Sequence, residues 1–263
     1  MNSKELAKLL PEMEAIVRKA GAIVVDHSAR RRNITRKGRI DLVTETDVAV
    51  EEMLKEALAK LLPGSDFLAE ESASETEPGE LTWIIDPLDG TTNFAHGLPF
   101  VANSVGLWHQ DRVVLGVVNL PLLHELLSAG EGLGTRLNDK PVRVSSTSVM
   151  EDALLATGFP YAIEEHLETI LRHFRTLLPL TQGIRRPGAA ALDLAYVACG
   201  RYDGFFESAL HPWDTAAGIL LVKEAGGRVS EYDADESYGF GSGSILATNG
   251  LLHDRLSGLL LRS

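Results

Sequence analysis

A succession of short apolar segments, separated by turn residues, constrains the fold of this chain more than any other feature. Their length and their content of β-branched and aromatic residues predict neighbouring strands of a sheet. The expected strands cover residues 67–69, 81–85, 101–108, 113–120 and 124–129. A sheet of this kind needs covering helices to bury its apolar side chains.

Helical periodicity supplies those covering elements. Apolar residues recur every three or four positions over 5–25 and again over 46–62, where Thr44 or Thr46 caps the second helix. The second half of the chain is expected to hold strands at 154–157 and 202–206 and helices at 164–178, 189–198, 215–225 and 251–261. Strands and helices therefore alternate, and the sequence predicts an α+β sandwich of layered sheets and helices.

The domain organisation follows from one composition change. A Ser/Thr cluster at 145–148 is the best candidate for a boundary. We expect an N-terminal lobe, 1–145, and a C-terminal lobe, 146–263, closely joined as one continuous structural unit.

The charge balance excludes several classes of partner. The 263 residues carry 25 Lys and Arg against 37 Asp and Glu, a formal net charge of −12, which disfavours direct nucleic-acid binding and anionic membrane surfaces. A phosphate ligand would therefore need a local site. The single cysteine allows no internal disulfide, and there is neither a secretory leader nor an apolar run of roughly 18 residues, so we expect a cytoplasmic protein without a membrane partner.

The most informative segment is WIIDPLDGTTN, residues 83–93. An apolar strand ends at Asp86, a proline favours a turn, and the spacing brings Asp86 and Asp89 to one side with the Leu88 carbonyl between them. Such hard oxygen atoms suit Mg²⁺, which retains water and substrate phosphate in its octahedral shell. Residues 90–92 are expected to begin a helix whose free N–H groups form an anion site; Gly90 permits close approach to a phosphate oxygen, and Thr91 adds a hydroxyl that can orient a water. When this segment is considered by itself, an ordinary Asp-Pro turn with a helix cap explains the same residues.

Two further acidic positions favour a metal site over an ordinary turn. The run FLAEES ends an apolar strand at Glu70, from which a carboxylate reaches the edge of a sheet. In HPWDT, Asp214 precedes a helix expected to begin at Thr215, so N-capping is the better explanation when this residue is taken alone. Several such segments in order are harder to explain by structure alone than any one of them.

Together these segments resemble the inositol monophosphatase family, within the lithium-sensitive, magnesium-dependent phosphatase superfamily. The resemblance rests on DLVTETD at 41–47, EES at 70–72, the 83–94 segment, and Trp213-Asp214 with EAGG at 224–227, and it covers nearly the whole chain. It implies a layered α/β/α/β/α sandwich of the sugar-phosphatase type.

The resemblance also implies roles for individual residues. Two or three Mg²⁺ ions would be bound by Glu70, Asp86, the Leu88 carbonyl, Asp89 and Asp214. Asp47, Thr91 and Glu70 would orient and activate the attacking water, and the N–H groups of Gly90 and Thr91 would hold the phosphate. The implied substrate-binding residues are Glu70, Leu88, Asp89, Gly90, Thr91, Gly188, Ala189, Ala190, Glu207 and Asp214.

The substrate side departs from the family in places. Relatives often carry Ser or Thr where this chain has Ala189, which leaves only backbone contact there. Arg185 and Arg186 are expected to form structural salt bridges or, less favourably, to bind a second phosphate. Residues 36–41 resemble a mobile lobe beside a third metal ion.

Three functions remain open at this point. The first is hydrolysis of myo-inositol monophosphate or another small polyol or sugar phosphate. The second keeps the chemistry but acts on fructose 1,6-bisphosphate, histidinol phosphate or a 3′-phosphoadenosine nucleotide. The third is a non-catalytic regulatory role with the transcription machinery. The resemblance also implies a homodimer.

Overall fold

The computed structural model describes residues 1–29, 34–36, 42–73, 77–160 and 162–262. The described residues form seven α-helices: α1 Ser3–Ser28, α2 Glu45–Leu61, α3 Thr91–His96, α4 Ile163–Leu177, α5 Ala190–Ala198, α6 Pro212–Glu224 and α7 His253–Arg262. Short 3₁₀ turns cover Pro121–Leu123, Met150–Asp152 and Leu178–Leu180. None of the helices in these described ranges is long and apolar enough to cross a membrane.

The larger sheet follows the chain order. Its seven strands lie side by side as β3-β4-β5-β6-β7-β8-β9, and all neighbours are antiparallel except β3 and β4, which are parallel. The strands are β3 Asp66–Ala69, β4 Leu81–Asp89, β5 Ala102–His109, β6 Arg112–Leu120, β7 Glu125–Gly130, β8 Gly134–Leu137 and β9 Lys140–Val142. The expected strands in this half are therefore present, and β8 and β9 extend the sheet by a hairpin.

The smaller sheet mixes directions. Its order is β11-β10-β12-β14-β13, in which β10 runs parallel to β11 and β12, whereas β14 is antiparallel to β12 and β13. The strands are β10 Leu154–Thr157, β11 Gly183–Arg185, β12 Gly204–Ser208, β13 Arg228–Ser230 and β14 Ser244–Thr248. A separate antiparallel pair joins β1 Ile34–Arg36 to β2 Leu42–Thr44. The segment expected beside a third metal, 36–41, lies outside the described residues apart from Arg36 at the end of β1.

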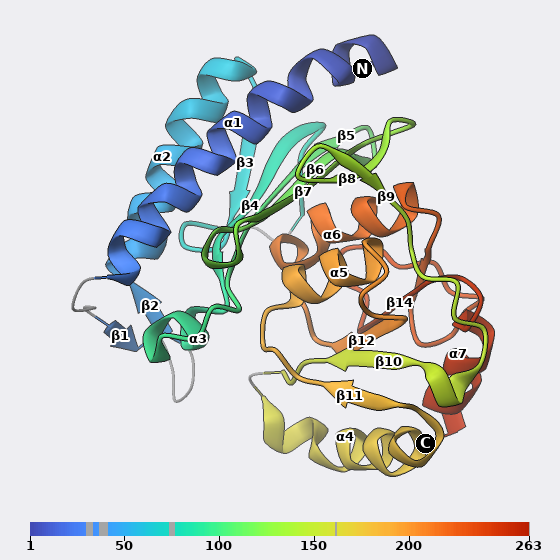
Figure 1. Ribbon diagram of the computed structural model, residues 1–263. Coiled ribbons are helices and arrows are strands. Elements are labelled where there is room, and N and C mark those ends of the chain that lie inside the picture. The colour runs from blue at the N-terminus through green and yellow to red at the C-terminus, as the bar shows by residue number, and fades with distance from the viewer. Residues whose placement is uncertain (30–33, 37–41, 74–76, 161, 263) are drawn as a thin grey trace.

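The elements stack in five layers (Figure 1). Helices α1 and α2 cover the outer face of the larger sheet, α5 and α6 fill the space between the sheets, and α4 and α7 cover the outer face of the smaller sheet. Alternation along β4 explains this packing, because Trp83 and Ile85 point to the outer helices and Ile84 points to the inner ones. The predicted α/β/α/β/α sandwich is confirmed.

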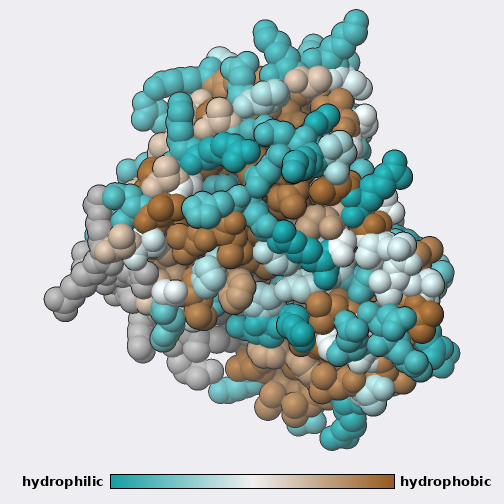
Figure 2. All heavy atoms as spheres, viewed as in Figure 1, coloured by the Kyte–Doolittle hydropathy of each residue, from teal (hydrophilic) through white to brown (hydrophobic). Residues whose placement is uncertain are grey.

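The molecular surface, seen from the same side, differs in hydropathy between the layers (Figure 2). Hydrophilic side chains cover much of the upper part, over α1 and α2, whereas hydrophobic side chains gather along the lower edge, over α4. Leu167 and Leu171 of α4 are exposed there. The suggested lobe boundary after residue 145 falls between β9 and the turn at Met150–Asp152, and the division into two lobes stays a prediction.

Candidate active site

The end of strand β4 carries two of the predicted carboxylates. The pairing with β5 matches Asp86 to Ser104 and Asp89 to Ala102, so one extra residue of β4 bulges between these pairs. The Asn103 amide donates to the Pro87 carbonyl at 2.7 Å and so fixes the bulge. A bulge redirects side chains locally, which here turns Asp86 and Asp89 toward the same cleft.

Backbone N–H groups from three separate places orient the carboxylates. Asp86 accepts a hydrogen bond from the Leu88 N–H at 2.9 Å. Asp89 accepts one from the Ala191 N–H, in the first turn of α5, at 2.7 Å. Asp214 accepts one from the His211 N–H at 2.7 Å. These charge-assisted bonds are shorter and stronger than neutral ones, so the three side chains are held in place before any ligand binds.

Glu70 joins the same group from the larger sheet. It follows the last residue of β3, and its backbone N–H donates to the Ile85 carbonyl of β4 at 3.1 Å. Its carboxyl lies close enough to that of Asp86 for a shared hydrogen bond, which contributes to raising the pKa of Asp86. Two carboxyl groups can share such a bond only if one of them is protonated, so this pair needs either a proton or a cation between its oxygens.

Burial and mutual repulsion shift the pKa values of these groups upward. Burial raises the pKa of Asp86 well above its usual range, and the charges of Glu70, Asp89 and Asp214 raise it further. Burial, followed by the charge of Asp214, raises the pKa of Asp89 to about 7. Burial also raises the pKa of Asp214 to about 7. The cleft thus gathers more negative charge than it can hold unless cations or protons offset it.

The donor set fits hard divalent cations. Carboxylates and the Leu88 carbonyl supply oxygen only, which is the preference of Mg²⁺, Ca²⁺ and Mn²⁺ rather than of softer metals. Within the part of the chain that the structure describes, no three acidic, histidine or cysteine side chains already form a metal cage. An ion bound here would therefore take carbonyl, water or substrate oxygens as well.

Asp47 reaches the cleft through Thr91. The Thr91 hydroxyl lies 3.1 Å from an Asp47 carboxylate oxygen and 3.0 Å from the Leu88 carbonyl. Asp47 is fully buried in the first turn of α2, where it also accepts from the N–H of Thr44, the N-cap residue, at 2.9 Å. Burial raises the pKa of Asp47 despite these bonds. The structure thus brings together the two residues expected to orient a water.

The opposite wall of the cleft holds the expected substrate contacts. Gly188, Ala189, Ala190 and Glu207 line a volume of about 390 Å³ together with Gly90 and the carboxylates. Gly90 has a φ of +86°, and a Cβ there would come within 2.6 Å of the Phe100 carbonyl, so the turn after Asp89 requires glycine. Glu207 is only 7% exposed.

One expected feature of Asp214 is wrong. The sequence predicts it as the N-cap of a helix from Thr215, but α6 begins at Pro212 and His211 is the N-cap. Proline suits the first helical position because its φ is already helical and its missing N–H would have no partner there. Asp214 is thereby placed one turn inside, where its carboxylate bonds back to His211 and lines the cleft.

Sequence reasoning missed several other residues of the cleft. The Asn93 amide donates to the carbonyls of Phe100 and Pro187, at 2.8 and 2.9 Å, and so ties α3 to the segment that precedes α5. Its place in the 83–93 segment was the available signal. Phe159 also lines the cleft, and no local pattern marks it, whereas Arg186, already singled out from the sequence, lines the cleft as well. Neither Arg185 nor Arg186 forms an expected salt bridge with any described residue.

Comparison with known proteins supports one family. The family model described as "Inositol monophosphatase family" matches residues 5–262. An inositol-1-monophosphatase from Synechocystis sp. is 45% identical over 240 residues, which cover 90% of this chain and 83% of that protein. A Nus factor SuhB from Pseudomonas aeruginosa is 44% identical over 222 residues, with 82% of each chain covered.

The solved structures agree with the sequences. The structure of inositol monophosphatase from Anabaena (Nostoc) sp. matches with a TM-score of 0.88 and 40% identity, covering 98% of this chain and 97% of that one. The family match spans nearly the whole chain, and relatives share the fold at this level of identity. The chain therefore belongs to the inositol monophosphatase family and is a phosphoric monoester hydrolase.

Proposed function

We propose that the protein hydrolyses a small phosphate monoester, in the first place myo-inositol monophosphate, with two or three Mg²⁺ ions held by Glu70, Asp86, Leu88, Asp89 and Asp214. The observation that carries this proposal is the convergence of buried, mutually repelling carboxylates on one cleft. When bound, the ions would offset that charge, favour a nucleophilic water at neutral pH and stabilise the departing oxygen.

The protein's own residues orient the reactants. Asp47 accepts a hydrogen bond from the Thr91 hydroxyl, which leaves the Thr91 oxygen able to accept a hydrogen bond from the attacking water. Asp47 is also suited to take up the proton of that water, because burial raises its pKa. Backbone N–H groups at Gly90 and Thr91 would hold the phosphate, and Glu207 would accept hydrogen bonds from substrate hydroxyls.

A phosphate-release screen tests the proposal. Wild-type protein is assayed with Mg²⁺ on polyol, sugar, amino-alcohol and nucleotide monophosphates, and also on fructose 1,6-bisphosphate. We expect release from inositol 1-phosphate that stops when the ions are chelated. Asp152→Asn, at an exposed carboxylate outside the cleft, serves as a control that keeps full activity. Chelator-resistant turnover would overturn the metal assignment, and a much better substrate of another class would replace inositol phosphate.

A second candidate function rests on the relatives named Nus factor SuhB, which are 40–44% identical. We infer that a regulatory role with the transcription machinery is compatible with the same fold. Affinity capture of transcription complexes by the wild type and by Asp89→Asn tests it, since a binding role survives loss of turnover. Absence of these complexes from both captures would remove this candidate.

Three finer properties belong to the same proposal. We expect inhibition by lithium, a cytoplasmic location and a homodimer, as the resemblance to the family implies. Inhibition curves with LiCl, cell fractionation and sedimentation velocity measure them separately. A monomer at working concentration would remove the dimer without affecting the chemistry.

A further inference from the structure

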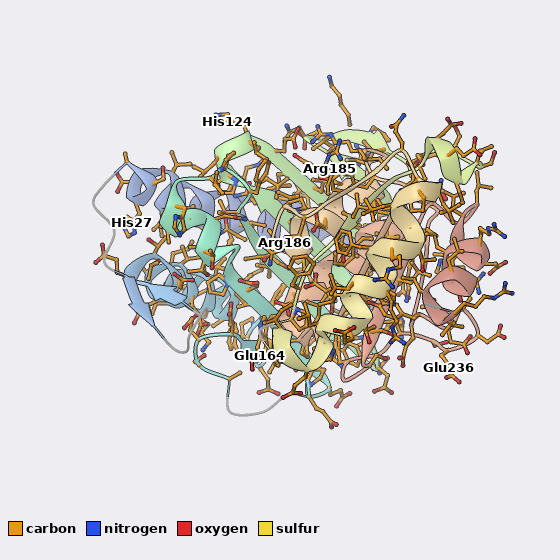
Figure 3. All side chains as sticks on the ribbon, turned by 90° about the horizontal axis from the view of Figure 1, so that it is seen from below. His27, His124, Glu164, Arg185, Arg186 and Glu236 are labelled. Carbon is orange, nitrogen blue, oxygen red and sulfur yellow. The ribbon has the colours of Figure 1, made fainter. Side chains whose placement is uncertain are left out.

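An uncommitted cation stands at the rim of the candidate cleft. Arg186 lines the cleft and is exposed, and its guanidinium forms no hydrogen bond or ion pair with any residue that the structure describes. Figure 3 shows Arg186 near the middle of the view, with Arg185 apart from it. Burial raises the pKa of the Glu207 and Asp193 carboxyls, and the charge of Arg186 acts on both and partly offsets this rise. Arg186 makes no direct ion pair with either of them, so its N–H groups are available for a ligand.

Aromatic stacking holds this guanidinium in place. It lies over the ring of Phe159, 4.9 Å from the ring centre, and Phe159 in turn contacts Phe174 of α4 edge-on at 6.0 Å. On its other side, a Cβ added to Gly188 would come within 2.7 Å of the guanidinium, so the group lies directly against the substrate-binding segment. Stacking positions the charge without neutralising it.

An unused acceptor lies on the same wall. Glu207 is 7% exposed, and its carboxylate makes no hydrogen bond with any residue in the described ranges. Its carboxylate packs so closely on Gly158 that a Cβ there would lie 2.1 Å from each oxygen. Gly158 is followed by Phe159, so one short segment makes room for the Glu207 acceptor and supports the Arg186 donor.

The sheet topology explains why these groups meet. Strands β10, β11 and β12 are parallel neighbours, so their carboxyl ends lie at one edge of the smaller sheet. Gly158 and Phe159 follow β10, Arg186 follows β11, and Glu207 is the second-last residue of β12. The crevice outside the carboxyl ends of parallel strands is a general place for ligands in such sheets.

We propose that Arg186 forms a second anion subsite, and that the enzyme accepts, besides singly anionic esters such as myo-inositol monophosphate, phosphate monoesters that carry another anionic group, a phosphate or a carboxylate, away from the ester that is cleaved. The proposal rests on the proposed function and specifies its substrate class. Glu207 would bind the hydroxyls between the two anionic groups. The protein as a whole carries a formal net charge of −12 and repels a doubly anionic substrate, so a local cation is needed to hold its second charge.

The test uses matched pairs of substrates and two neighbouring arginines. Fructose 1,6-bisphosphate is compared with fructose 1-phosphate, and 6-phosphogluconate with glucitol 6-phosphate, in Mg²⁺. For each pair the preference is the ratio of the two kcat/KM values. We expect Arg186→Ala to lower this preference about 10- to 100-fold, mainly through KM, as for loss of a hydrogen-bonded charge. Arg185→Ala is the control, because within the described ranges the Arg185 side chain donates only to the Ile184 carbonyl, and it lies outside the cleft lining.

Further measurements identify the anion that the subsite binds, and distinguish failure of the subsite from failure of the phosphatase activity. An effect on the bisphosphate pair alone assigns the subsite to a phosphate, and one on both pairs assigns it to either anion. Phe159→Leu should lower the same preference by a smaller factor, because the guanidinium loses its support. An unchanged preference in Arg186→Ala overturns the subsite while leaving the phosphatase intact. Should the wild type cleave none of the esters, calorimetry of the same compounds decides, and equal binding by wild type and Arg186→Ala refutes the subsite.

Discussion

The contact between helix α6 and the larger sheet yields a sharp prediction for both stability and activity. Gly106 of β5 and Gly116 of β6 are directly paired, and α6 crosses them. A Cβ on Gly116 would lie 2.9 Å from the Ala217 carbonyl oxygen and 3.0 Å from its Cα, where ordinary contact begins at 3.4 Å. Gly116→Ala therefore requires the helix backbone to move by about 0.5 Å.

The helix has no free space into which to move. Its other side packs on α5, where a Cβ on Gly218 would already lie 2.6 Å from the Leu194 Cβ. Overpacking of this kind costs about 1–3 kcal/mol. Alanine lowers the conformational entropy of the unfolded chain, which offsets up to about 1 kcal/mol of this cost. We therefore expect the free energy of unfolding to fall by about 1–2 kcal/mol. That corresponds to a fall in Tm of roughly 2–8 °C for a domain of this size.

Activity should fall as well, because α6 carries Asp214 one turn before Ala217. Misplacement of a catalytic group by 1 Å can cost about 100-fold, so a shift of half that size should lower kcat/KM by about tenfold. Urea unfolding and phosphate release measure the two effects. Gly258→Ala is the matched control, since nothing lies within 4 Å of its Cβ on α7 and a helical alanine should stabilise the protein slightly. Wild-type stability in Gly116→Ala, or lost stability with unchanged kcat/KM, would refute the reasoning.

Three further changes probe other parts of the molecule. Asp89→Asn should reduce turnover at least 100-fold and raise the Tm of the metal-free protein at neutral pH, because one repelling carboxylate is gone; full activity in Mg²⁺ would contradict its assignment. Glu51→Gln should lower kcat several-fold, a larger change than that in KM. The reason is that the buried Glu51 carboxylate accepts a hydrogen bond from the Glu71 N–H at 2.9 Å and so positions the adjacent Glu70; unchanged kcat would exclude this role. His253 is fully buried, and its pKa is lowered to about 4, mainly by burial. Its neutral form therefore contributes fully to the stability of the folded protein above pH 6.5, and this contribution is lost as the pH falls toward 4. The stability advantage of the wild type over His253→Gln should therefore shrink by about 2 kcal/mol between pH 7 and pH 4.5, and a constant difference in urea unfolding would disprove it.

The sequence predicts the larger sheet well because its strands are consecutive. Each strand pairs with the next, so local apolar runs and turns such as Asn138-Asp139, both with positive φ, are enough to define it. The last residues of β4 were harder to predict, since the strand continues through the bulge as far as Asp89. Proline at 87 favours a turn, and only the long-range bond from Asn103 shows that the ladder resumes.

The smaller sheet is less predictable for the opposite reason. Strands β11 and β13 are only three residues long, and β14 follows a Gly- and Ser-rich segment, so none has a clear local pattern. Their pairing depends on contacts far apart in the chain. The same holds for Phe159 and Arg186, which share the cleft only because β10 and β11 are parallel neighbours. By contrast, the acidic residues of the cleft stand in local segments whose residue types alone suggest the chemistry.

The two sheets each supply part of the cleft, so any function of the site depends on their relative position. Glu70, Asp86 and Asp89 come from the larger sheet, whereas Glu207 comes from the smaller one. Helix α5, which packs between the sheets, is tied to the larger sheet at the cleft by the bond from the Ala191 N–H to Asp89, and Asn93 of α3 bonds to the segment before α5. Away from the cleft, Arg201 forms an ion pair with Glu125 of β7. Because Asp89 is both a candidate ligand and one of these ties, charge compensation at the carboxylates and alignment of the two sheets should be coupled, and binding of a cation should tighten the substrate wall as well as the metal site.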